Sequence, residues 1–81
     1  MNVLALLRRT RGLSQEDVSR AVGIRQKTLS EYERGLRPTP VNLIKLAQFF
    51  HVPEQDAPRL MREAHGDLIE DLPRVVLEHV G

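Results

Sequence analysis

The stretch from Gln15 to Arg34, QEDVSRAVGIRQKTLSEYER, leaves this chain few folds to adopt. It places apolar, small and glycine residues where two helices that cross steeply through a short turn need them. These positions are Val18, Ser19, Val22, Gly23, Ile24, Leu29 and Tyr32. A generic helical hairpin matches the apolar positions by chance, but it rarely also has a glycine in the turn and a small residue opposite it. We therefore predict two short, tightly crossed helices.

The remainder of the chain has the same helical periodicity. Apolar residues recur at spacings of three and four rather than two, so the chain is predicted to be all-α. The expected helix starts are Asn2, Ser14 with Asp17 as an approximate capping box, Gln26, Thr39 followed by Pro40, and Asp56. The expected helix ends are Gly12, Val22, Arg34, the His51-Val52-Pro53 run and Gly66. A helical tail, kinked or restarted at Pro73, is expected to follow.

Length and composition exclude several classes of protein. A chain of 81 residues forms one small domain with a thin core, so oligomerisation is expected. The absence of Cys excludes disulfides, thiolate zinc fingers and iron–sulfur clusters. Apolar runs such as Val3 to Leu7 are far shorter than the ~18 residues of a membrane span. No signal peptide is expected, because Arg8 and Arg9 follow this run instead of preceding it.

The formal net charge of +1 conceals an uneven distribution. Residues 1–50 contain nine Lys and Arg against four Asp and Glu, a net charge of +5. Residues 51–81 contain three Arg against seven Asp and Glu, a net charge of −4. This asymmetry predicts a polyanionic partner for the first half of the chain. Charges scattered for solubility are the alternative.

No pattern of residues indicates catalysis or cofactor binding. The three histidines, His51, His65 and His79, lack the spacing of metal ligands. The chain has no glycine-rich phosphate loop and no nucleophile at a recognisable spacing from a base. We therefore expect no enzymatic activity, no catalytic residue, no metal site and no cofactor.

Three stretches, LRRTRGLSQEDV, VGIRQKTLSEYERG and LIKLAQFFHV, resemble the Cro/phage-repressor-like (XRE-type) helix-turn-helix DNA-binding domains. The likeness runs from about Leu4 to Val52, over half of the chain. It implies a compact five-helix, lambda-repressor-like domain that binds double-stranded DNA, with the third helix in the major groove. The chain departs from the family pattern at Arg25, where a capping Ser or Thr is common, at Ser19, where Ala is usual, and in a loop at 37–40 that is one residue shorter.

Exposed residues at the start of the third helix are the ones that can reach base edges. The candidates are Gln26, Lys27, Ser30 and Glu31. The family resemblance implies base contacts at all of these positions except Ser30. Gln can pair with adenine, Lys with guanine and Glu with cytosine. The alternative for Lys27 and Glu31 is a surface ion pair at spacing i, i+4, worth only about 0.3 kcal/mol.

Other polar residues flank this helix and are expected to touch the DNA backbone. The phosphate-binding candidates are Gln15, Arg25, Thr28, Arg34 and Arg37. Gln15 opens the second helix, where free N–H groups and the helix dipole favour a phosphate. Such contacts set the register on DNA without reading its sequence. A solvated surface is the alternative for each of them.

A structural role is expected for Arg8 and Glu33. Arg8 falls on the inward side of the first helix, and Glu33 lies in the last turn of the third. The resemblance implies that these two positions form a partly buried ion pair, which ties the first helix to the DNA-reading helix.

The end of the chain is expected to supply a homodimer interface, because its apolar surface exceeds what so small a core can cover. The interface candidates are Ile69, Leu72, Val75, Val76 and Val80. The alternative is that this segment folds back and closes the monomer core. The chain thus divides into a DNA-binding domain at 1–66 and a helical tail at 67–81.

The expected function is sequence-specific DNA binding as a transcriptional regulator on a two-fold-symmetric operator. No membrane and no small-molecule effector is expected as a partner, and the expected location is the cytoplasm, at the nucleoid, for a bacterial or phage protein. A protein–protein interaction module, such as an antitoxin-type domain on the same fold, is the alternative function.

Overall fold

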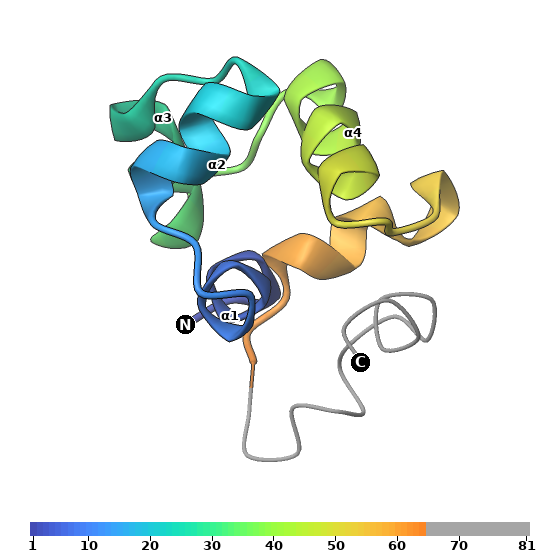
Figure 1. The fold of residues 1–81 in the computed structure, drawn as a ribbon. Coiled ribbons are helices and arrows are strands. Elements are labelled where there is room, and N and C mark those ends of the chain that lie inside the picture. The colour runs from blue at the N-terminus through green and yellow to red at the C-terminus, as the bar shows by residue number, and fades with distance from the viewer. Residues whose placement is uncertain (65–81) are drawn as a thin grey trace.

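A computed structural model describes residues 1–64, which form four α-helices and one 3-10 helix (Figure 1). The elements in chain order are α1 (Val3–Thr10), α2 (Gln15–Val22), α3 (Gln26–Glu33), α4 (Pro40–Phe49) and the 3-10 helix η1 (Glu54–Met61). The predicted all-α fold is confirmed. The sequence-based expectations for residues 65–81, including the helical tail and its dimer interface, lie outside the described residues.

Local capping interactions start three of the helices as the sequence predicts. Asn2 caps α1 by accepting a hydrogen bond from the Ala5 N–H at 3.0 Å. Ser14 and Asp17 form a complete capping box at the start of α2. Thr39 caps α4, and Pro40 occupies its first position. These bonds satisfy backbone N–H groups that have no partner inside a helix. By contrast, Arg25 precedes α3 without any side-chain cap.

The turn between α2 and α3 is held by Ser19 and Gly23. Gly23 has a φ of +73°, a left-handed conformation that glycine adopts without strain. The Ser19 carbonyl accepts hydrogen bonds from the N–H groups of Gly23 and Ile24, and its hydroxyl donates to the Ile24 carbonyl. Ser19 is therefore more than a small residue at a close approach, because it also fixes the turn that sets α3 against α2.

The last described element corrects the sequence prediction. Asp56 does not cap a helix, because η1 begins two residues earlier, at Glu54, without a side-chain cap. The element also ends at Met61 rather than continuing to Gly66. The following residues pair instead with the first three residues of the chain: the Val3 N–H donates to the Arg62 carbonyl at 2.9 Å, and the Ala64 N–H donates to the Met1 carbonyl at 2.8 Å. This long-range backbone pairing competes with helix continuation.

One apolar core joins all five elements. Its buried residues are Val3, Leu4, Leu7, Val18, Ile24, Leu29, Tyr32, Leu46, Ala47, Phe50, Val52, Ala57 and Leu60. Figure 1 shows α2 and α3 together on one side, α4 on another, and η1 returning beneath α4 toward α1. The core therefore leaves the outer surface of α2 and α3 open. Within residues 1–64, no helix is long and apolar enough to cross a membrane.

The capping box of α2 gives a testable pH dependence. Hydrogen bonding with Ser14, from its backbone N–H above all, lowers the pKa of Asp17 below its usual 3.8. A lowered folded-state pKa means that the Asp17 contribution to stability is complete above pH 3.8 and is lost as the pH falls through the folded-state value. Between about pH 5 and pH 3, the melting temperature of the unaltered chain should therefore fall more steeply than that of Asp17→Asn. Equal slopes in thermal melts followed by circular dichroism would contradict this role.

Candidate functional site

The start of α3 presents a row of exposed polar side chains. Arg25, Gln26 and Lys27 are all exposed. None of the three side chains has a hydrogen bond or ion pair to any residue in the described part of the chain. On the opposite face of α3, Leu29 and Tyr32 are 0% and 3% exposed and anchor the helix to the core. The buried face of α3 therefore fixes the helix to the core, while its first turn remains free to contact a partner.

Ser30 and Glu31 lie one turn further along α3 and are partly buried. The alternative reading of Lys27 and Glu31 as an ion pair does not hold, because no salt bridge joins them among residues 1–64. Both charges thus remain available to other groups.

The residues expected to flank DNA fall into two groups. Arg34 caps the end of α3 and Arg37 lies in the loop before α4; both are exposed and have no ion pair within the described residues. Thr28 and Gln15 are partly buried. Of these four residues, only Gln15 uses its side chain in a hydrogen bond inside residues 1–64.

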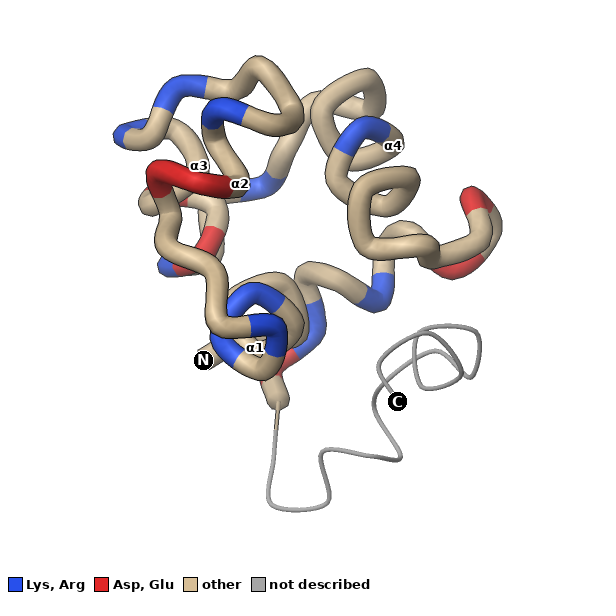
Figure 2. Tube along the Cα trace, viewed as in Figure 1, with Lys and Arg blue, Asp and Glu red and all other residues tan. Residues whose placement is uncertain are grey.

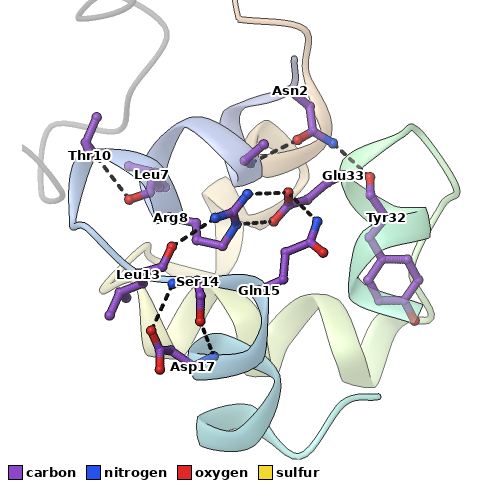
Figure 3. A network of polar contacts seen from close by, with 11 residues as sticks. Asn2, Leu7, Arg8, Thr10, Leu13, Ser14, Gln15, Asp17, Tyr32 and Glu33 are labelled. Atoms are coloured by element: carbon purple, nitrogen blue, oxygen red, sulfur yellow. Dashed lines mark hydrogen bonds and ion pairs between the residues drawn. The ribbon is translucent and has the colours of Figure 1, made fainter. Parts of the chain in front are cut away.

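That hydrogen bond belongs to a buried network centred on Glu33 (Figure 3). Arg8 forms a two-point ion pair with the Glu33 carboxylate, through Nε at 2.7 Å and Nη2 at 2.9 Å. The side chains of Arg8 and Glu33 are only 11% and 6% exposed. The remaining Arg8 nitrogen donates to the Leu13 carbonyl at 2.9 Å, and Gln15 Nε2 donates to Glu33 Oε1 at 3.1 Å. One carboxylate thus joins α1, α2 and α3.

The ion pair also affects the titration of Arg8. The hydrogen bonds to Glu33 raise the pKa of the Arg8 guanidinium above its usual value, although burial opposes this change. Arg8 therefore stays charged. Among the described residues, no buried side-chain nitrogen or oxygen is left without a hydrogen-bond partner. The network is thus fully satisfied, as a buried polar cluster must be to avoid destabilising the fold.

Two asparagines position α3, and sequence reasoning missed both contacts. Buried Asn2 donates from Nδ2 to the Tyr32 carbonyl at 2.9 Å, in addition to capping α1. Asn42 in the first turn of α4 donates from Nδ2 to the Tyr32 hydroxyl at 2.9 Å. Tyr32 is therefore held at both its backbone and its ring oxygen. The Tyr32 hydroxyl is the feature of the sequence that could have indicated one of these contacts, because a buried tyrosine usually finds a hydrogen-bond partner.

Charge is unevenly distributed over the fold. Figure 2 shows Lys and Arg on all four α-helices, while Asp and Glu concentrate at the start of α2, along α3 and at η1. The exposed cations that have no ion pair within residues 1–64 include Arg9, Arg25, Lys27, Arg34, Arg37 and Lys45. In the same part of the chain, no group of three or more His, Asp or Glu is arranged to hold a metal ion. Four of these exposed cations, Arg25, Lys27, Arg34 and Arg37, lie within α3 or close to its two ends in the sequence.

Comparisons with known proteins identify the family of this chain. A family model described as helix-turn-helix matches residues 4–56. The protein named "Uncharacterized HTH-type transcriptional regulator y4dJ", from Sinorhizobium fredii (strain NBRC 101917 / NGR234), is 51% identical over 45 residues. The match covers 54% of this chain and 58% of that relative, so the chain matches little more than half the length of the relative. No solved structure matches the chain significantly.

Proposed function

Because the chain belongs to the Cro/phage-repressor-like (XRE-type) helix-turn-helix family, we propose that it is a transcriptional regulator that inserts α3 into the major groove of a two-fold-symmetric DNA operator. The observation that carries this proposal is the exposed first turn of α3, in which Gln26 and Lys27 have no partner within residues 1–64. A major groove accommodates one α-helix, and residues at the N-terminal end of that helix reach the bases.

The side chains on α3 supply different hydrogen-bonding chemistry for base edges. Gln26 can form two hydrogen bonds with adenine, and Lys27 can donate to guanine O6 and N7. Glu31 can accept from cytosine N4, and Ser30 can bond to several bases. Gln15, Thr28 and the three cations Arg25, Arg34 and Arg37 are proposed to bind phosphates on either side of the groove.

A selection of bound fragments from random duplex DNA tests this proposal directly. A two-fold-symmetric motif is expected, with half-sites about 34 Å apart along the duplex. Such a motif supports both sequence-specific binding and a homodimer on DNA. Enrichment of no motif would refute sequence-specific binding, and a motif with a single half-site would refute the symmetric dimer.

Substitution of Lys27 tests base recognition separately from general attraction to DNA. Lys27→Ala should remove the preference for one base in each half-site and cost about 1–3 kcal/mol against the best sequence. Lys45→Ala is the matched control, because Lys45 is an exposed cation on α4 that is not assigned to base reading. Anisotropy titrations with duplexes carrying each base at that position measure the preference. An unchanged preference in Lys27→Ala would argue against its assignment.

The dimer is proposed to depend on the end of the chain, through Ile69, Leu72, Val75, Val76 and Val80. Truncation after Gly66 is therefore expected to convert a dimer into a monomer, as measured by analytical ultracentrifugation. A dimer that survives this truncation would show that its interface lies elsewhere. Leu36 and Val41, which are 50% and 63% exposed, would then be the first residues to substitute.

A further inference from the structure

We propose that Glu33 is a positioning residue for DNA binding: its carboxylate, held by Arg8, orients the Gln15 amide so that one N–H remains directed to a phosphate. This inference rests on the proposed DNA-binding function and assigns the buried ion pair a role in it beyond stability. Three hydrogen bonds carry it, and all of them converge on the Glu33 carboxylate (Figure 3).

The chemistry of the carboxylate determines which end of the Gln15 amide faces it. An ionised carboxylate only accepts hydrogen bonds, so the amide must direct its nitrogen, not its oxygen, toward Glu33 Oε1. The amide nitrogen carries two hydrogens, and one of them is used in this bond. The second hydrogen is left for another acceptor. Phosphate oxygens also only accept, so the orientation set by Glu33 is compatible with phosphate binding.

Without Glu33, the Gln15 amide would lose this preference. The terminal amide torsion is broad and roughly two-fold, so nitrogen and oxygen would exchange places. With the oxygen turned toward a phosphate, the contact would be repulsive. Gln15 is the first residue of α2, where the backbone N–H groups and the helix dipole also attract an anion. The orientation of the Gln15 amide thus decides whether this side chain adds to the attraction of the N–H groups and the helix dipole for a phosphate or opposes it.

Arg8 is required because Glu33 alone would repel the same phosphate. The two-point ion pair, at 2.7 and 2.9 Å, neutralises the carboxylate and fixes its plane. Glu33 can then orient Gln15 without contributing a net negative charge near the DNA. Arg8 thus acts through Glu33, and Glu33 acts through Gln15.

The test is a thermodynamic cycle on DNA affinity, with the full chain and a fluorescein-labelled duplex of the selected sequence. Arg8→Met/Glu33→Met removes one charge of each sign, so the net charge is unchanged, and apolar replacement of a buried pair commonly leaves a protein folded. We expect this double variant and Gln15→Ala each to bind about threefold to tenfold more weakly, reflecting the freedom regained by one side chain. The triple variant, which combines all three substitutions, should bind no more weakly than the weaker-binding of these two variants.

Two results would overturn the inference. One is an unchanged affinity of the double methionine variant; the other is a triple variant whose loss equals the product of the two separate losses. Gln26→Ala is the control, because Gln26 has no bond to the network and should cost the same factor in both backgrounds. If the unaltered chain binds no DNA, the proposed function fails together with this inference. If the unaltered chain binds DNA and one of the two results above is obtained, only the positioning role of Glu33 fails.

A conservative single substitution supplies a second, independent measurement. Glu33→Gln retains the size of the side chain and removes one negative charge. If Glu33 acted on DNA only through its charge, this variant would bind DNA more tightly. If Glu33 positions Gln15, the variant should bind more weakly, because a neutral amide offers fewer acceptor sites to Gln15 and Arg8. Tighter binding would therefore overturn the inference.

Discussion

The affinity of the chain for its selected duplex is expected to fall about a thousandfold when salt is raised from about 50 to 200 mM. Each protomer has three exposed arginines, Arg25, Arg34 and Arg37, that have no ion pair within the described residues and are proposed to bind phosphates. A dimer therefore neutralises about six phosphates, and the slope of log affinity against log salt should be about −5. Anisotropy titrations at several salt concentrations measure this slope directly.

The same titrations distinguish DNA binding from the alternative function. Random DNA should give a similar slope at lower affinity, because phosphate contacts do not depend on sequence. Arg37→Ala should make the slope shallower by about two in a dimer, with the base preferences unchanged. A binding constant that does not change with salt would point to a protein partner and away from DNA.

The α-helical part of the fold could be predicted because its signals are local. Asn2, Ser14 with Asp17, and Thr39 each act on backbone N–H groups only three residues away. Capping chemistry can therefore be seen directly in the sequence. The end of η1 could not be predicted in this way, because the partner of residues 62–64 is the chain around Met1, some sixty residues earlier. That distant pairing accounts for the end of the element at Met61, whereas nothing in the structure explains why η1 begins at Glu54 and not after Asp56.

The same distinction between local and long-range interactions applies to the candidate site. The exposure of Gln26 and Lys27 follows from helical periodicity once Leu29 and Tyr32 are assigned to the core. The pairing of Arg8 with Glu33 was anticipated only from the family resemblance, since no spacing rule relates residues 25 positions apart. The hydrogen bond from Gln15 to Glu33 was not anticipated, because it depends on the three-dimensional approach of three helices. Helical periodicity thus predicts which side chains are exposed, whereas a polar network between helices depends on how the helices approach one another in three dimensions.

Loss of either partner of the buried ion pair should be among the most destabilising single changes to this domain. Arg8→Met leaves the Glu33 carboxylate, which is only 6% exposed, without its cation, and we expect a cost of about 3–5 kcal/mol. A domain of this size has a total unfolding free energy on the order of 4–12 kcal/mol, so the variant would retain only part of its stability. Urea denaturation followed by circular dichroism measures the loss.

The matching change at Glu33 shows how this cost arises. Glu33→Met leaves the Arg8 guanidinium buried and should cost a similar amount, whereas the double methionine variant should be close to the unaltered chain, because no unpaired charge remains. The double-mutant cycle should therefore give a coupling energy of several kcal/mol. If the two single losses simply add, the ion pair is not the link between α1 and α3, and the apolar contacts of Leu4, Leu7 and Leu29 would have to hold the DNA-reading helix in place without it.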